Sequence, residues 1–158
     1  MTTYDVTVVE LPAQPVAEVR ATVAAEELPE FLGKAYGEVL AAAGRQHVAP
    51  AGAPFGRYHP DARGFEVEAG FPTSGPVTGE GRVRAAELPG GLAARTLHTG
   101  DYGAVGAAYD ALQGWMADHG YVPTGEPWEC YLDGPDVPEP RTEVYFPCRA
   151  PATVPEQR

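Results

Sequence analysis

The chain has 158 residues, a formal net charge of −11 and 44% hydrophobic residues. Its length and hydrophobic content predict one folded domain with a substantial core. Its acidic balance argues against a phosphate-backbone partner, because Lys and Arg side chains carry such binding. It has no metal-ligand spacing of Cys and His, no glycine-rich nucleotide motif, no apolar stretch of about 20 residues and no secretion signal at its start. We therefore expect a cytoplasmic protein that needs no metal or cofactor and contacts neither nucleic acid nor membrane directly.

The first half of the chain predicts four strands and one helix. The strand segments alternate, are rich in valine and aromatic residues, and end near prolines. The helix segment repeats apolar residues at spacings of three and four, with Pro29 in its first turn and Gly44 at its end. In chain order we expect strands over residues 4–10 and 15–23, a helix over residues 28–44, and strands over residues 55–59 and 65–71.

The second half predicts the same sequence of elements. Its helix has apolar residues along one face from Tyr102 to His119, and Gly120 is expected to stop it. A turn-rich linker over residues 73–80 separates the halves, and the proline-rich tail over residues 150–158 is expected to be disordered. In chain order we expect strands over residues 81–87 and 92–98, a helix over residues 103–119, and strands over residues 128–132 and 142–146.

A seven-residue sequence motif occurs twice. Gly52-Ala-Pro-Phe-Gly-Arg-Tyr58 returns 73 residues later as Gly125-Glu-Pro-Trp-Glu-Cys-Tyr131, with Gly56 replaced by Glu129. The duplication predicts an α+β fold of two repeats, about 4–72 and 80–147, with pseudo-two-fold symmetry. About eight antiparallel strands and two main helices would form a central ligand groove at the seam. Glu129, present in only one copy, is the best candidate for chemistry there.

Strand alternation sorts the side chains of these segments into two faces. We expect an apolar set to pack under the helices: Phe55, Trp128, Cys130, Leu132, Val144 and Phe146. The other face would gather Tyr58, Glu129, Tyr131, Glu143 and Tyr145. Carboxylates among tyrosine rings suit a flat or cationic ligand, but the same alternation is equally typical of a solvated sheet face. The residues alone leave both interpretations open.

His98 and the two cysteines have simpler interpretations. His98 precedes the second helix, in His98-Thr-Gly-Asp-Tyr102, where Asp101 is a suitable N-cap. A structural, hydrogen-bonding histidine is expected there, because no nucleophile motif accompanies it. Cys130 and Cys148 are expected to be buried, reduced and structural.

Six segments in order resemble the GyrI-like small-molecule-binding domain, over residues 4–147 within a single domain of residues 1–149. They are the Glu-Leu-Pro segments, Pro54-Phe-Gly-Arg-Tyr58, Glu68-Ala-Gly-Phe-Pro72, Leu88-Pro-Gly-Gly91, His98-Thr-Gly-Asp-Tyr102 and Trp128-Glu-Cys-Tyr131.

The resemblance implies a duplicated β-α-β-β body with an acidic residue among aromatics in its groove. That residue corresponds to Glu129, and Glu143 and Tyr145 are carried over from the last strand. The same domain is the effector-binding part of AraC-type and MerR-type regulators, whose DNA-binding half has no counterpart here.

We therefore expect a stand-alone protein that binds, sequesters or senses diverse hydrophobic, aromatic or cationic molecules, as in multidrug binding. Glu129 would supply charge, Tyr58, Tyr131 and Tyr145 would stack, and Tyr36 and Tyr109 would line the groove from the helices. Two alternatives stay open. One is hydrolysis of cyclopropane-containing DNA-alkylating compounds, with Glu129 as general base and Tyr131 or Tyr145 as hydrogen-bond donor to the developing phenolate. The other is a protein partner, such as gyrase, which the protein would inhibit, or a regulator.

Overall fold

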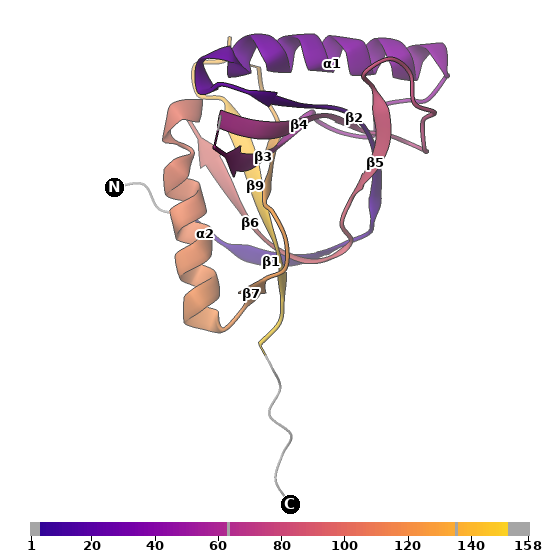
Figure 1. Ribbon diagram of the computed structural model, residues 1–158. Coiled ribbons are helices and arrows are strands. Elements are labelled where there is room, and N and C mark those ends of the chain that lie inside the picture. The colour runs from indigo at the N-terminus through magenta and orange to yellow at the C-terminus, as the bar shows by residue number, and fades with distance from the viewer. Residues whose placement is uncertain (1–3, 63, 135, 152–158) are drawn as a thin grey trace, which may run out of the picture.

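The computed structural model describes residues 4–62, 64–134 and 136–151. It contains two main helices and one curled sheet (Figure 1). The helices are α1 (Leu28–Arg45) and α2 (Gly106–His119), and short 3-10 turns, η1 (Ala25–Glu27) and η2 (Tyr102–Ala104), precede them. The strands are β1 (Thr7–Leu11), β2 (Gln14–Val23), β3 (Phe55–Asp61), β4 (Gly64–Pro72), β5 (Arg84–Leu88), β6 (Gly91–Thr99), β7 (Val122–Pro123), β8 (Trp128–Tyr131) and β9 (Arg141–Arg149).

The predicted α+β class and every predicted helix and strand are confirmed, with shifted ends. The second helix begins later than expected because the Asp101 carboxylate accepts a hydrogen bond from Gly103 N and caps the 3-10 turn instead. Gly120 ends α2 in the left-handed conformation, at φ 76°, which glycine adopts without strain. The short strand β7 was not predicted, and residues 152–158 of the expected disordered tail lie outside the described residues. None of the described helices could cross a membrane.

The sheet order places the seam between the halves at its centre. The order is β1-β6-β9-β8-β3-β4-β2-β5, with β7 pairing β9, and all pairs are antiparallel. Each half gives one strand to the other, since β1 pairs with β6 and β5 pairs with β2. Corresponding strands thus hold mirrored places along the order, while the pseudo-two-fold axis in space stays a prediction. Strands β3 and β8 meet at the seam.

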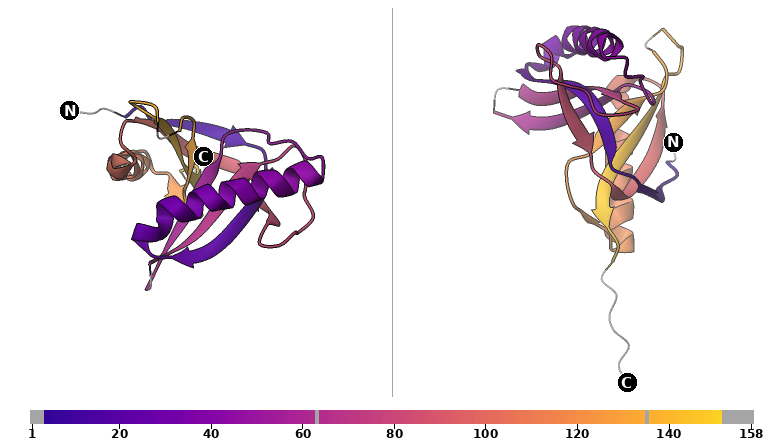
Figure 2. Two further views of the ribbon diagram at one scale, coloured as in Figure 1. Left: turned by 90° about the horizontal axis from the view of Figure 1, so that it is seen from above. Right: turned by 90° about the vertical axis from the view of Figure 1, so that its right-hand side faces the viewer.

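Both helices pack on the same face of the sheet, which we call the helix face. Helix α1 lies over β2 and β4, and α2 lies over β6 and β9. Seen from above, α1 runs lengthwise across the sheet while α2 is seen end-on (Figure 2). Cross-strand pairs show that the two helices share this face. Val67, under α1, pairs with Tyr58, and Gly56, two residues before Tyr58 on the same strand, pairs with Glu129. Glu129 in turn pairs with Val144, under α2. We call the other side the open face.

The expected packing set is divided between the two faces, which corrects the prediction. Val144 and Phe146 do pack under α2. Phe55, Trp128 and Cys130 instead lie on the open face, in a cluster with Val16 and Leu88. Alternation within one strand was predicted correctly, but it does not say which face of the next strand is continuous with it.

Candidate functional site

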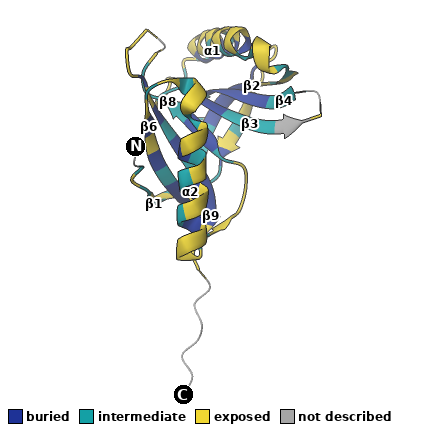
Figure 3. Ribbon diagram, turned by 90° about the vertical axis from the view of Figure 1, so that its left-hand side faces the viewer, coloured by how far each residue is buried: buried dark blue, intermediate teal, exposed yellow. Residues whose placement is uncertain are grey.

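The seam strands β3 and β8 lie between the two helices on the helix face. In Figure 3 they are visible between α1, at the top, and α2, in front. Gly56 and Glu129 are direct cross-strand partners, and they occupy the same position in the two copies of the repeated motif. This unlike position of the repeat therefore lies at the centre of the seam, and it places one carboxylate there rather than two. Two glutamates facing each other would repel at this distance.

Glu129 is a buried carboxylate, 8% exposed, and tyrosine hydroxyls hold it on both oxygens. The Tyr109 hydroxyl, on α2, donates to Oε2 at 2.5 Å, and the Tyr131 hydroxyl donates to Oε1 at 3.0 Å. Among the described residues, Glu129 forms no ion pair with Lys, Arg or His. Its partners are thus neutral donors, and no guanidinium or ammonium group neutralises it.

Further tyrosines extend this arrangement across the seam. Tyr58, the counterpart of Tyr131 in the repeat, shares a 2.5 Å hydrogen bond with it. Tyr36, the counterpart of Tyr109, donates from α1 to the Phe55 carbonyl oxygen at 3.0 Å. The Tyr102 ring meets the Tyr131 ring edge-on at 5.8 Å. We call the set around Glu129 the tyrosine cluster, and its members are Tyr36, Tyr58, Tyr102, Tyr109 and Tyr131.

Burial shapes the proton affinities in the cluster. Burial raises the pKa of Glu129, against the lowering effect of hydrogen bonds from Tyr109 and Tyr131 and of the nearby His98. Burial, followed by the nearby Glu129 charge, also raises the pKa of Tyr58, Tyr109 and Tyr131. The raised phenol pKa values keep these hydroxyls protonated, so they act as hydrogen-bond donors in the cluster.

Gly56 makes room for the hydrogen bonds of the seam. A Cβ atom at this position would lie 2.7 Å from the Tyr58 hydroxyl oxygen and 3.0 Å from the Tyr131 hydroxyl oxygen. Both distances are shorter than van der Waals contact allows. Gly56 and Tyr102 belong to this site although the sequence argument had not assigned them to it. The glycine facing Glu129 in the repeat was the signal for Gly56.

Glu143 and Tyr145 do not join Glu129, which corrects their expected place beside it. Glu129 pairs directly with Val144, so the residues on either side of Val144 point to the open face. There the Tyr145 ring stacks on Trp128, with centroids 5.4 Å apart, and its hydroxyl donates to Glu143 at 3.1 Å. The Glu129 site thus retains Tyr36, Tyr58, Tyr109 and Tyr131 of the predicted residues.

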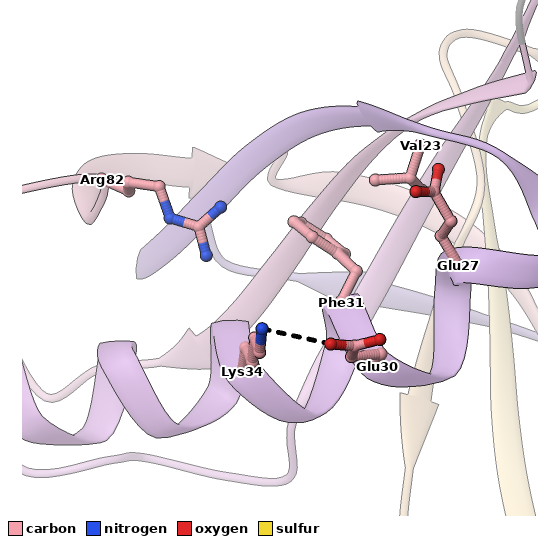
Figure 4. Close-up of a pocket in the computed structure, with 6 residues that line it drawn as sticks. All are labelled: Val23, Glu27, Glu30, Phe31, Lys34 and Arg82. Atoms are coloured by element: carbon pink, nitrogen blue, oxygen red, sulfur yellow. Dashed lines mark ion pairs between the residues drawn. The ribbon is translucent and has the colours of Figure 1, made fainter.

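Two hollows of about 240 Å³ each lie away from Glu129. The first, beside the start of α1, is lined by charged side chains around Phe31, including Arg82 and the Glu30–Lys34 ion pair (Figure 4). The second lies on the open face beside Trp128 and Tyr145. Glu129 lines neither hollow, and the central groove stays a prediction.

His98 has the structural role that was predicted. Its Nδ1 atom is hydrogen-bonded to the Tyr4 hydroxyl at 2.9 Å, and its Nε2 atom to the Asp101 carbonyl oxygen at 2.8 Å. Both cysteines are free thiols, and Cys148 is buried, while Cys130 is half-buried. Within the described residues no cluster of three or more His, Cys, Asp or Glu side chains could hold a metal ion.

Comparison with known proteins agrees with this architecture. The GyrI-like small molecule binding domain matches residues 4–149, so the chain belongs to this family. The crystal structure of the EcmrR C-terminal domain is 26% identical, with a TM-score of 0.74, over 94% of this chain and 99% of that chain. No curated protein matches the chain.

Two further structures share the fold. In a cryo-EM structure of an EcmrR–DNA complex, the match is 23% identical with a TM-score of 0.78, over 93% of this chain and 58% of that chain. The chain thus spans little more than half of that longer relative. SAV2435 bound to tetraphenylphosphonium is 14% identical, with a TM-score of 0.62, over 92% of this chain and 94% of that chain.

Proposed function

We propose that the protein binds chemically diverse hydrophobic cations at Glu129 and the tyrosine cluster. The observation that carries this proposal is a buried carboxylate without a cationic partner among the described residues. A buried charge is costly unless it is paired. Glu129 therefore gains from a cation that arrives from outside, and membership of a small-molecule-binding family supports this direction.

The tyrosine cluster suits such a ligand in two ways. Its rings offer flat apolar surfaces and a negative π face, which attract aromatic and cationic groups. Its hydroxyls hydrogen-bond Glu129 when no ligand is present, which lowers the cost of burying the carboxylate without cancelling its charge. Recognition by rings and one charge, with few directed hydrogen bonds to the ligand, explains how diverse compounds would share one site. The tetraphenylphosphonium cation in the SAV2435 structure supplies a suitable probe.

The test compares a cation with a neutral compound of similar shape. Tetraphenylphosphonium and triphenylphosphine oxide are titrated into the wild-type protein, Glu129→Gln and the matched control Glu143→Gln by calorimetry. We expect Glu129→Gln to weaken the phosphonium roughly 10- to 100-fold while the neutral compound changes little. Glu143→Gln should leave the phosphonium affinity unchanged, because its side chain lies on the other face.

Equal losses for the two compounds in Glu129→Gln would contradict the proposal, since they would indicate a general disturbance of the site. Equal losses of phosphonium affinity in the two variants would contradict it as well. Circular dichroism and thermal melting confirm that each variant is folded before its affinity is interpreted.

Hydrolysis of a strained cyclopropane ring is the second candidate. The supporting observation is a carboxyl whose pKa is raised by burial, beside the Tyr131 hydroxyl at 3.0 Å. Water would attack a cyclopropane carbon while Glu129 takes its proton, and the ring C–C bond to that carbon would break, with its electron pair passing to a conjugated carbonyl oxygen of the substrate. The Tyr131 hydroxyl would hydrogen-bond this oxyanion, which then takes up the proton from Glu129. Tyr145, on the open face, cannot reach this reaction. Incubation with a spirocyclopropane compound and mass spectrometry for a water adduct tests it. Absence of an adduct despite saturating binding would leave binding alone.

A further inference from the structure

The open-face hollow is a second concave surface on the same seam strand. Successive residues of β8 point to opposite faces. Glu129 and Tyr131 therefore lie on the helix face, while Trp128 and Cys130 line this hollow. Its walls come from six separate segments of the chain, including the β1–β2 turn, the loop before β3 and the end of β5. The hollow is therefore a product of the exchanged strands rather than a gap in one loop.

The walls are mostly apolar, with one carboxylate among them. Trp128 is stacked on Tyr145 and also lies under the Arg57 guanidinium, 5.7 Å from the ring centroid. Leu11 and Leu88 add aliphatic surface. Glu143 is the only ionisable carboxylate in the lining, and within the described residues it forms no ion pair.

The arginines near Glu143 each have another partner, including Arg141, which forms an ion pair with Asp133. Arg57 donates to the Glu126 carbonyl oxygen at 2.9 Å, and Arg95 lies beside the Tyr145 hydroxyl. Glu143 accepts a hydrogen bond from Tyr145 alone among the described side chains. A carboxylate at the edge of an apolar hollow, in a protein of net charge −11, favours a ligand that is apolar over most of its surface and cationic at one end.

We propose that this hollow is a second small-molecule site, separate from Glu129, which takes compact aromatic amines. The ring would lie against Tyr145, Leu11 and Leu88, and the ammonium group would pair with Glu143. A volume of about 240 Å³ is below the range of about 300 Å³ and more that holds drug-sized ligands, so one aromatic ring with a short amine is the fitting size. The large cations proposed for the tyrosine cluster are too big for it.

Trp128 gives the test a local reporter. The chain has two tryptophans, and Trp115 lies on α2 beside His119, in the other core cluster. In a Trp115→Phe background the emission excited at 295 nm comes from Trp128 alone. Phenethylamine and the neutral 2-phenylethanol are titrated against this protein and against the same protein with Glu143→Gln or Glu129→Gln.

We expect a saturable change with phenethylamine and about fivefold weaker binding of the alcohol. Glu143→Gln should reduce the amine to the affinity of the alcohol, and Glu129→Gln should leave it unchanged. If Trp115→Phe does not fold, the indole N–H signal of Trp128 in the wild-type NMR spectrum gives the same readout.

Three results would overturn this second site. One is no saturation with the amine. Another is loss of the amine in Glu129→Gln but not in Glu143→Gln, which would place it at the tyrosine cluster. The third is a dimer by sedimentation that already shields Trp128 without ligand, because a second copy would then cover the hollow. Phosphonium binding in the same variants depends on Glu129 alone, so failure of this site and failure of the proposed function are distinguishable.

Discussion

Two buried carboxylates, Glu129 on the helix face and Glu18 on the open face, have opposite kinds of partner. Glu18, 1% exposed on β2, receives two hydrogen bonds from Arg84 at 3.0 and 3.2 Å and also lies against the carboxyl of Glu68. Glu68 in turn contacts His59 at 2.6 Å. Glu18 thus has a cationic partner, whereas the partners of Glu129 among the described residues are tyrosine hydroxyls.

The difference distinguishes a carboxylate with a structural role, Glu18, from the carboxylate that we propose binds a ligand, Glu129. At Glu18 an arginine of the same chain already forms an ion pair with the carboxylate, and a cationic ligand would have to compete with it. At Glu129 neutral donors lower the cost of burial without cancelling the charge, so an external cation adds a new attraction. The amount of burial is therefore a poor guide to function here, and the charge of the partner is the informative property.

The largest expected effect separates the two acids by ligand affinity. Glu129→Gln should weaken tetraphenylphosphonium roughly 10- to 100-fold, while Glu18→Gln should change it less than about twofold, because Glu18 lies on the other face. Calorimetric titration of the two variants side by side measures this. Comparable losses in both would show that the contrast between the acids has no bearing on binding.

Gly56→Ala tests the seam itself. The added methyl group would press on the Tyr58 and Tyr131 hydroxyls, so we expect a loss of about 1–3 kcal/mol in the free energy of unfolding. Gly114→Ala is the matched control, since a Cβ there meets nothing within 4 Å and alanine favours a helix. Urea denaturation compares the two. A Gly56→Ala protein as stable as Gly114→Ala would mean that the hydroxyl network does not need the glycine.

The pH dependence of stability should report the Glu18 pair. Burial and the nearby Glu68 charge raise the pKa of Glu18 from 4.5 to about 7. The folded state therefore holds a proton that the unfolded chain releases, and wild-type stability should fall as the pH rises from about 4.5 to about 7. Glu68, whose pKa is lowered by His59 despite its burial, contributes only below that window.

Glu18→Gln removes this fall, so the stability of the variant relative to the wild type should rise by about 2 kcal/mol between pH 4.5 and 7.5. Denaturation curves at several pH values measure the difference. A difference that stays constant with pH would show that Glu18 titrates normally.

Tyr109→Phe is expected to have the smallest effect. It removes the 2.5 Å donor to Glu129, which makes the ionised carboxylate costlier, so cation affinity should fall about fivefold. Tyr121→Phe is the control, because Tyr121 packs beside Trp115 in the α2 cluster, away from the seam. Fluorescence titration with tetraphenylphosphonium compares the two. An unchanged affinity in Tyr109→Phe would show that the hydroxyl is not part of the ligand site.

The sequence was sufficient for the elements and for the central glutamate. Alternation and helical spacing predicted each main strand and helix, because those patterns follow from local backbone geometry. The Gly56–Glu129 mismatch identified the pair that the sheet places directly opposite each other. The first inference depends on periodic spacing along the chain and the second on the repeated motif, and both patterns are visible in the sequence.

The sequence did not predict how the strands pair with one another. Glu143 and Tyr145 were expected beside Glu129, yet a register that pairs Glu129 with Val144 turns them to the open face. Register depends on how β8 and β9 come together across a nine-residue connection, which alternation within either strand does not determine. The exchange of β1 and β5 between the halves was not predicted either, because these pairings join residues far apart in the sequence.

The most direct measurement of the central claim is the pKa of Glu129 with and without a bound cation. In protein labelled with ¹³C at glutamate carboxyls, the signal missing in Glu129→Gln identifies the group, and its pH titration gives the pKa. We predict a pKa above 4.5 in the free protein and a lower one with tetraphenylphosphonium bound, because a cation favours the ionised form. A Glu129 pKa that the bound cation leaves unchanged would contradict the account.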